Sequence, residues 1–175
     1  MNLEKLQVGL LALLKSREQE PQNDHPYFHQ VNSSGRLSAL QEISGWWRIF
    51  AIEKTCILTS TLLKRRGTFD EVAGRFASRP DVTPYYQQQA AVFLADMGCH
   101  SDPLIAAVAS FEAALLAIKA GDMTGPVTIE WQHAPYAVLK SLLLGAPLDE
   151  AKIRGAYRMV VSRETPELFY VQPLP

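Results

Sequence analysis

Two histidines near the start of the chain have the spacing of a metal-binding pair. His25 and His29 are four residues apart, and on a helix that spacing would place both rings on one face. Pro26 directly follows His25 in a polar stretch and argues against such a helix. A structural zinc site takes four ligands, and the sequence places no cysteine or carboxylate cluster to complete one. We therefore expect exposed loop histidines and no metal on this chain.

Cys99 and His100 are a second pair of residue types that could do chemistry. A cysteine nucleophile needs a base within hydrogen-bond reach and a third group that orients the base. Adjacent residues point their side chains apart on most backbones, and the sequence supplies no orienting group. Cys56 and Cys99 have no CxxC partner, so we expect reduced thiols that fill small apolar spaces in a cytoplasmic protein.

The charged residues favour structural roles. Lys64, Arg65 and Arg66 end a predicted helix, where cations complement the helix dipole, so they are a weak signal for nucleic acid. The net charge of −1 gives no overall attraction to nucleic acid or to an anionic membrane. Glu112 lies in an apolar stretch and needs a buried partner, for which Arg48 is the expected one.

The spacing of apolar residues predicts a bundle of about five helices in the first part of the 175-residue chain. Residues 21–37 are expected to form a long loop, and a break at Gly45 is left open. Thr68 and Glu71 predict a capping box, and Asp102 before Pro103 predicts the start of the last long helix. The expected helices cover residues 3–16, 38–63, 69–76, 85–97 and 104–120.

The start of the chain lacks the basic region and apolar core of a secretory signal. No uninterrupted apolar run reaches the roughly 18–20 residues that cross a bilayer, so no membrane partner is expected.

The hydrophobic period changes near Gly125. Residues 127–131 alternate between apolar and polar side chains, which predicts a half-buried strand, and residues 136–144 predict a helix. Residues 156–161 and 168–171 predict two more strands in an antiparallel hairpin. The expected fold class is therefore α+β, with a helical domain at residues 1–122 and a small α+β domain at residues 126–175. A sheet of about three strands has edges that can pair with another chain's strand.

Two segments are candidates for binding. Arg158 and Arg163 flank an apolar strand that would suit an acidic peptide at a sheet edge; a solvated outer face is the alternative. The candidate peptide-binding residues are Tyr157, Arg158, Met159, Val160, Val161, Ser162 and Arg163. Trp46 and Trp47 stand about 100° apart on a helix, so the core would bury one better and leave the other for a partner. The candidate partner interface consists of Trp46, Trp47, His25 and His29.

Several motifs together resemble a known family of accessory proteins. They are Trp47-Arg48-Ile49-Phe50, Leu62-Leu63, Phe69, Val72, Phe76, Pro84-Tyr85, Phe93-Leu94, residues 104–112, and in the tail residues 128–133 and 156–163. This pattern resembles the partner proteins of DUF692-type multinuclear iron enzymes, which modify ribosomally made peptides. Known members include the accessory subunits of methanobactin and of 3-thiaglutamate (pearlin) biosynthesis, and the compact length is more similar to the second. The pattern is also similar to the helical domain of DUF2063-type DNA-binding proteins.

The resemblance implies a non-catalytic recognition subunit that forms a heterodimer with the iron enzyme. It implies that the sheet receives the leader of a precursor peptide as an added strand and presents the peptide's C-terminal cysteine to the partner. Iron is expected in the partner's TIM barrel, with no cofactor and no catalytic residue on this chain. The alternatives are a helical DNA-binding regulator, which the net charge of −1 disfavours, and an independent enzyme that uses His25, His29 or Cys99.

Overall fold

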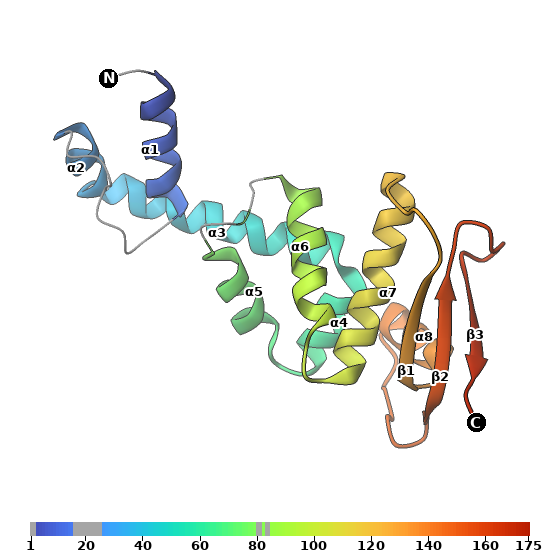
Figure 1. Cartoon of the computed structure of the whole chain (residues 1–175). Helices are drawn as coiled ribbons and strands as arrows, with labels where there is room; N and C mark the ends of the chain where they lie inside the picture. The colour runs from blue at the N-terminus through green and yellow to red at the C-terminus, as the bar shows by residue number, and fades with distance from the viewer. Residues whose placement is uncertain (1–2, 16–25, 80–81, 83–84) are drawn as a thin grey trace.

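The computed structural model describes residues 3–15, 26–79, 82 and 85–175. The described helices form the first part of the chain, and a three-stranded antiparallel sheet with one further helix forms the last (Figure 1). In chain order the elements are α1 (Leu3–Lys15), α2 (Pro26–Asn32), α3 (Gly35–Thr55), α4 (Ile57–Arg65), α5 (Phe69–Ala77), α6 (Tyr86–Gly98), α7 (Pro103–Ala120), β1 (Val127–His133), α8 (Pro135–Leu144), β2 (Arg154–Val161) and β3 (Phe169–Pro173). The predicted α+β class is confirmed.

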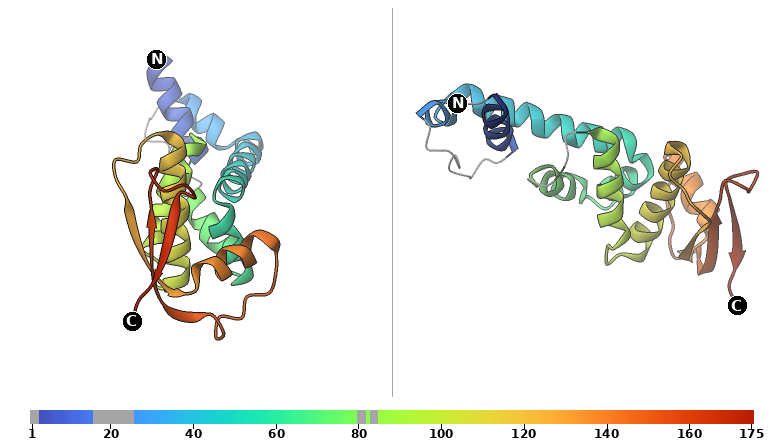
Figure 2. Two further views of the ribbon diagram at one scale, coloured as in Figure 1. Left: turned by 90° about the vertical axis from the view of Figure 1, so that its right-hand side faces the viewer. Right: turned by 45° about the horizontal axis from the view of Figure 1, so that its top comes forward.

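The described elements follow one another along an elongated molecule. α1 and α2 lie at one end, beside the first half of α3, and the sheet lies at the other end (Figures 1 and 2). The long helix α3 connects the α1–α2 end to the central bundle of α4, α5, α6 and α7. The candidate partner residues Trp46 and Trp47 therefore lie on α3, whereas the candidate peptide-binding residues 157–163 lie at the sheet end of the molecule.

Two hydrophobic clusters hold this arrangement together. The larger one runs from the second half of α3 through α4–α7 into the sheet, where it includes Trp131 and Met159. This one cluster therefore includes residues on both sides of positions 123–125. The secondary structure changes from helix to strand there, at the predicted place. The smaller one joins α1, α2 and the start of α3, and its buried members are Leu13, Phe28 and Leu37.

Helix α7 forms the centre of the larger cluster. The side chain of Asp102 accepts the backbone N–H of Leu104 at 2.9 Å, and Gly121 ends the helix in the left-handed region with φ 90°, as the sequence predicts. Among the described helices it is the one with the length and apolarity to cross a membrane, and 44% of it is buried inside the molecule. Glu112 interrupts its apolar sequence, so α7 contains no uninterrupted apolar run of that length.

Three local predictions for the helical part are wrong: the loop at residues 21–37, the single helix over residues 38–63 and the capping box at Thr68. The expected loop contains α2, and α3 continues through Gly45, where the sequence left a break open. The break comes instead at Cys56, whose φ of −103° and ψ of 61° end α3 before α4 begins. Thr68 precedes α5, but its side chain makes no capping hydrogen bond and its hydroxyl donates to the carbonyl of Leu63.

The sheet has the strand order β1-β2-β3, with both pairs antiparallel. The hairpin predicted for the last two strands is confirmed. One face of the sheet is buried against the helices, chiefly through Ile129, Trp131, Met159 and Val161. The opposite face carries mainly polar and charged side chains, with Val160 and Tyr170 among them, as alternation along a half-buried sheet predicts.

Candidate functional site

The candidate peptide strand lies in the middle of the sheet. β2 pairs with β1 on one side and with β3 on the other, so its backbone groups are already used. The prediction that residues 157–163 form an exposed edge is therefore wrong. Met159 and Val161 are fully buried, and no peptide could contact their side chains.

The free edge on the side away from α7 belongs to β3. At the two ends of the β2–β3 ladder, Ser162 N–H donates to Leu168 O and Leu174 N–H donates to Ala156 O, both at 2.8 Å. Backbone groups alternate in direction along an antiparallel strand, so the even-numbered residues of β3 face β2. The backbone N–H and C=O of Phe169 and Val171 consequently point away from the sheet. Pro173 occupies the next outward position, where its missing N–H costs no ladder bond.

Aromatic side chains line the buried side of this edge. The ring of Phe169 lies 5.1 Å from that of Phe111 on α7 and 5.6 Å from that of Tyr136 on α8, measured between centroids. Tyr136 is 53% exposed at the start of α8, whose Val138, Leu139 and Leu142 are buried in the core. A strand added to β3 would find an apolar surface on this face of the sheet.

The charges near the edge are fewer than the sequence suggests. Arg158 stands directly between Glu130 on β1 and Gln172 on β3, so a carboxylate is its neighbour on the outer face. Arg163 donates to the backbone carbonyl of Ile118 at 3.1 Å and ties the β2–β3 turn to the end of α7. Arg163 was predicted to select the charge of a bound peptide, but its side chain makes a structural contact instead.

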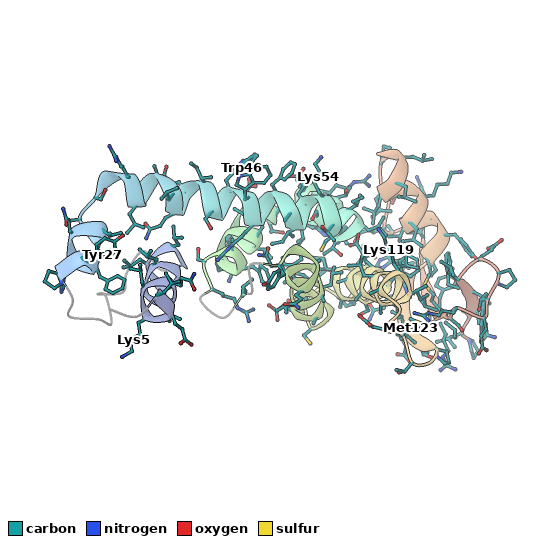
Figure 3. All side chains as sticks on the ribbon, turned by 90° about the horizontal axis from the view of Figure 1, so that it is seen from above. Lys5, Tyr27, Trp46, Lys54, Lys119 and Met123 are labelled. Atoms are coloured by element: carbon teal, nitrogen blue, oxygen red, sulfur yellow. The ribbon has the colours of Figure 1, made fainter. Side chains whose placement is uncertain are left out.

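Trp46 and Trp47 lie on the exposed side of α3. Both are 56% exposed, so the expectation that the core buries one better than the other is wrong. The two rings contact each other, and the ring of Trp46 stacks on that of Phe50 with a centroid distance of 5.2 Å. Figure 3 shows Trp46 and Lys54 on the side of α3 that faces away from α5 and α6. Together these side chains form an exposed aromatic surface.

The other candidate chemical residues do not come together. His25 lies outside the described residues, and His29 is exposed on α2. His100 accepts the backbone N–H of Asp102 at 3.0 Å and so contributes to the turn before α7. Cys99 is exposed, contrary to the expectation of an apolar filler. Within the described ranges, no three His, Cys, Asp or Glu side chains are grouped to hold a metal ion.

Glu112 is buried at the break between α3 and α4. Its carboxylate accepts the backbone N–H groups of Leu58 and Thr59, both at 2.9 Å, and so caps the N-terminus of α4 from another helix. Burial raises the pKa of Glu112, although hydrogen bonds from the start of α4 oppose the shift. Burial and the neighbouring Glu112 also raise the pKa of Cys56, so its thiol stays protonated and unreactive.

The predicted ion pair between Arg48 and Glu112 is wrong. Arg48 donates instead to the backbone carbonyl of Ala77 at 2.7 Å and satisfies the C-terminal end of α5. The sequence indicates that Glu112 needs a partner, but Glu112 and Arg48 are each satisfied by backbone groups at a helix end.

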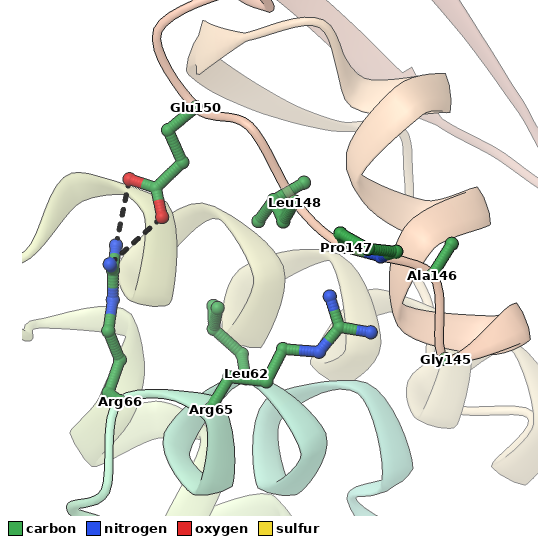
Figure 4. A pocket seen from close by; sticks show the side chains of 8 residues that line it. All are labelled: Leu62, Arg65, Arg66, Gly145, Ala146, Pro147, Leu148 and Glu150. Atoms are coloured by element: carbon green, nitrogen blue, oxygen red, sulfur yellow. Dashed lines mark hydrogen bonds and ion pairs between the residues drawn. The ribbon is translucent and has the colours of Figure 1, made fainter.

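A pocket of about 400 Å³ separates α4 from the loop after α8 (Figure 4). Arg65 donates to the hydroxyl and to the carbonyl of Ser141, and Arg66 pairs with Glu150 at 2.9 Å and with Asp102 at 3.1 Å. The hydrogen bond to Glu150 is the main cause that raises the pKa of Arg66. These contacts join the helical bundle to the C-terminal module, and they engage two of the cations that could have formed a basic patch.

Comparison with family models, with curated proteins and with solved structures finds no significant match to this chain. Sequence reasoning missed the outward backbone of Phe169 and Val171 and the role of Tyr136. The signal that could have found them is Pro173, because a proline inside a strand marks an outward position on an edge.

Proposed function

We propose that this chain is a cytoplasmic, non-catalytic recognition subunit that binds an extended peptide by strand addition to β3. The observation that carries the proposal is the free β3 edge, with the backbone of Phe169 and Val171 directed outward and the ring of Tyr136 beside it. Main-chain hydrogen bonds would supply affinity, and alternate side chains of the peptide would pack on the aromatic surface.

The proposed peptide is the leader of a ribosomally made precursor, and the proposed partner is a DUF692-type iron enzyme that modifies the precursor's C-terminal cysteine. The motif resemblance supports this assignment, and the exposed aromatic surface of α3 supports the existence of a protein partner. The iron belongs to the partner in this proposal, and the chain described here contributes recognition only.

A titration against the precursor peptide encoded beside the gene tests strand addition. Val171→Pro removes an outward N–H of β3 and should weaken binding by at least about tenfold, since it removes one main-chain hydrogen bond and crowds the edge. Thr128→Pro is the matched control, because Thr128 has the equivalent outward position on β1. It should leave the affinity unchanged.

The two variants separate the alternatives when circular dichroism shows that both are folded. Loss of binding with Thr128→Pro alone would move the peptide to β1. Equal affinity for the wild type and both variants would contradict strand addition at either edge.

A further inference from the structure

The exposed side of α3 carries six residues with the spacing of a coiled-coil seam. Intervals of four and three residues alternate strictly along it, which keeps the side chains in line for a facing helix. The seam consists of Arg36, Leu40, Ile43, Trp47, Phe50 and Lys54. Leu40 and Ile43 are 52% and 53% exposed, and none of the four central residues is fully buried.

The apolar part of the seam is a large exposed patch. With Trp46 stacked beside it, its exposed apolar area is on the order of 500 Å², which is at the upper end for a monomer and typical of docking sites. Trp46, Trp47 and Phe50 contact one another at its centre. Clustered aromatic residues at the middle of a patch are the usual hot spots of an interface.

Cations stand at both ends of the seam. Arg36 and Lys54 are exposed, and no ion pair joins either of them to a carboxylate in the described part of the chain. The ammonium of Lys54 lies over the ring of Phe50, 5.5 Å from its centroid. The two cations are 18 residues apart, five helical turns or about 27 Å, so both point the same way.

This charge pattern decides against a second copy of the chain. In an antiparallel pair, Arg36 of one copy would face Lys54 of the other, and in a parallel pair each cation would face itself. Either arrangement places like charges opposite each other at both ends of an apolar seam. A partner with carboxylates at both ends fits the same seam without repulsion.

A groove continues the seam at its Arg36 end. It has a volume of about 660 Å³ and lies between α1, α2 and the start of α3. Its apolar lining includes Leu10, Leu14 and Val31, and it shares Arg36 and Leu40 with the seam. A bulky apolar side chain at that end of the occupant would therefore find a place beside Arg36.

We propose that the α3 seam docks one amphipathic helix of a partner protein, with an apolar middle and a carboxylate at each end, about 18 residues apart. This inference names the kind of element that binds the helical part, and it does not depend on peptide binding at β3.

The test uses two synthetic helical peptides that differ only at their ends. Both carry leucines at seam spacing, and one has glutamates and the other lysines at two positions 18 residues apart. Binding is followed by the emission of Trp46 and Trp47, which are exposed, whereas Trp131 is buried and should not respond. The glutamate peptide should shift the emission to the blue and bind about tenfold more tightly than the lysine peptide.

The double variant R36E/K54E should reverse this preference while its melting curve stays unchanged, because both residues are exposed. Equal affinity for both peptides, or no emission change with either, would overturn the proposal. A dimer detected by light scattering and dissociated by Trp47→Ala would assign the seam to a second copy instead. Val171→Pro should bind the glutamate peptide like the wild type, so this result is independent of strand addition at β3.

Discussion

The carboxylate of Glu112, in the middle of α7, accepts the backbone N–H of Leu58 at 2.9 Å across 54 residues of sequence. Its other oxygen accepts the N–H of Thr59, so one side chain satisfies two buried groups at the start of α4. The bend at Cys56 contains no glycine or proline, and its hydrogen bonding is completed by a residue from another helix. Glu112 therefore stabilises the junction between α3 and α4.

Glu112→Gln should lower the free energy of unfolding by about 1–3 kcal/mol, because an amide offers one acceptor oxygen to two buried N–H groups. Urea unfolding at neutral pH measures the change. Glu71→Gln is the control, since that side chain is 72% exposed and should change stability by less than about 0.5 kcal/mol. Equal midpoints for the wild type and Glu112→Gln would contradict the capping role.

The stability effect of Glu112 should also depend on pH. Burial raises the pKa of Glu112 in the folded state above the ordinary value of 4.5. The folded protein therefore holds this proton more tightly, and the associated stability is present below the unfolded pKa and lost as pH rises through the folded pKa.

Comparison of the wild type with Glu112→Gln isolates this contribution, because the other carboxylates titrate alike in both proteins. The stability difference between them should become smaller as pH rises from the ordinary carboxyl range toward neutrality and above. Urea unfolding of both proteins across that range measures it. A difference that grows with pH would show that the two N–H groups, and not burial, dominate the titration.

Arg65→Ala should weaken the connection between the helical bundle and the C-terminal module. Arg65 donates to Ser141 Oγ at 2.8 Å and to Ser141 O at 2.7 Å, and loss of both bonds should cost about 1–3 kcal/mol of unfolding free energy. Arg75→Ala is the matched control, since its side chain is 73% exposed. Hydrogen exchange of α8 should increase in Arg65→Ala and not in the control.

Proline at two positions should distinguish the central strand from the edge. Val160 faces Tyr170 of β3 in the ladder, and Val160→Pro should remove a ladder bond and cost more than about 3 kcal/mol. Val171→Pro removes an outward N–H and should cost about 1 kcal/mol or less. Thermal unfolding followed by circular dichroism compares the two. Similar losses for both would contradict the deduced direction of the β3 backbone.

The sequence was sufficient for most elements because their signals are local. Alternation at residues 127–131 predicts β1, and the Asp102 cap and Gly121 bound α7 as expected. The break at Cys56 had no local signal, since it depends on Glu112. α2 was missed because a helix of 7 residues hardly differs from a loop in apolar periodicity.

The candidate site was harder to predict than the fold. Alternation identifies which face of a strand is buried, but it says nothing about which strand is central, so residues 157–163 could not be placed inside the sheet from their pattern. The sequence shows Trp46 and Trp47 as a pair. The placement of Arg36 and Lys54 on the same side of one helix, however, depends on α3 being continuous through Gly45. The position of β2 in the sheet and the continuity of α3 both depend on tertiary contacts and not on local sequence preference.

The position of β2 has a consequence for the order in which the protein is made. The ribosome releases β2 before β3, so until residues 169–173 emerge, the strand that ends in the centre of the sheet is itself an open edge. Its apolar run at Met159, Val160 and Val161 is then exposed to other nascent chains. The closing strand therefore protects the polypeptide against association during synthesis, and truncation before Phe169 should yield an aggregating product.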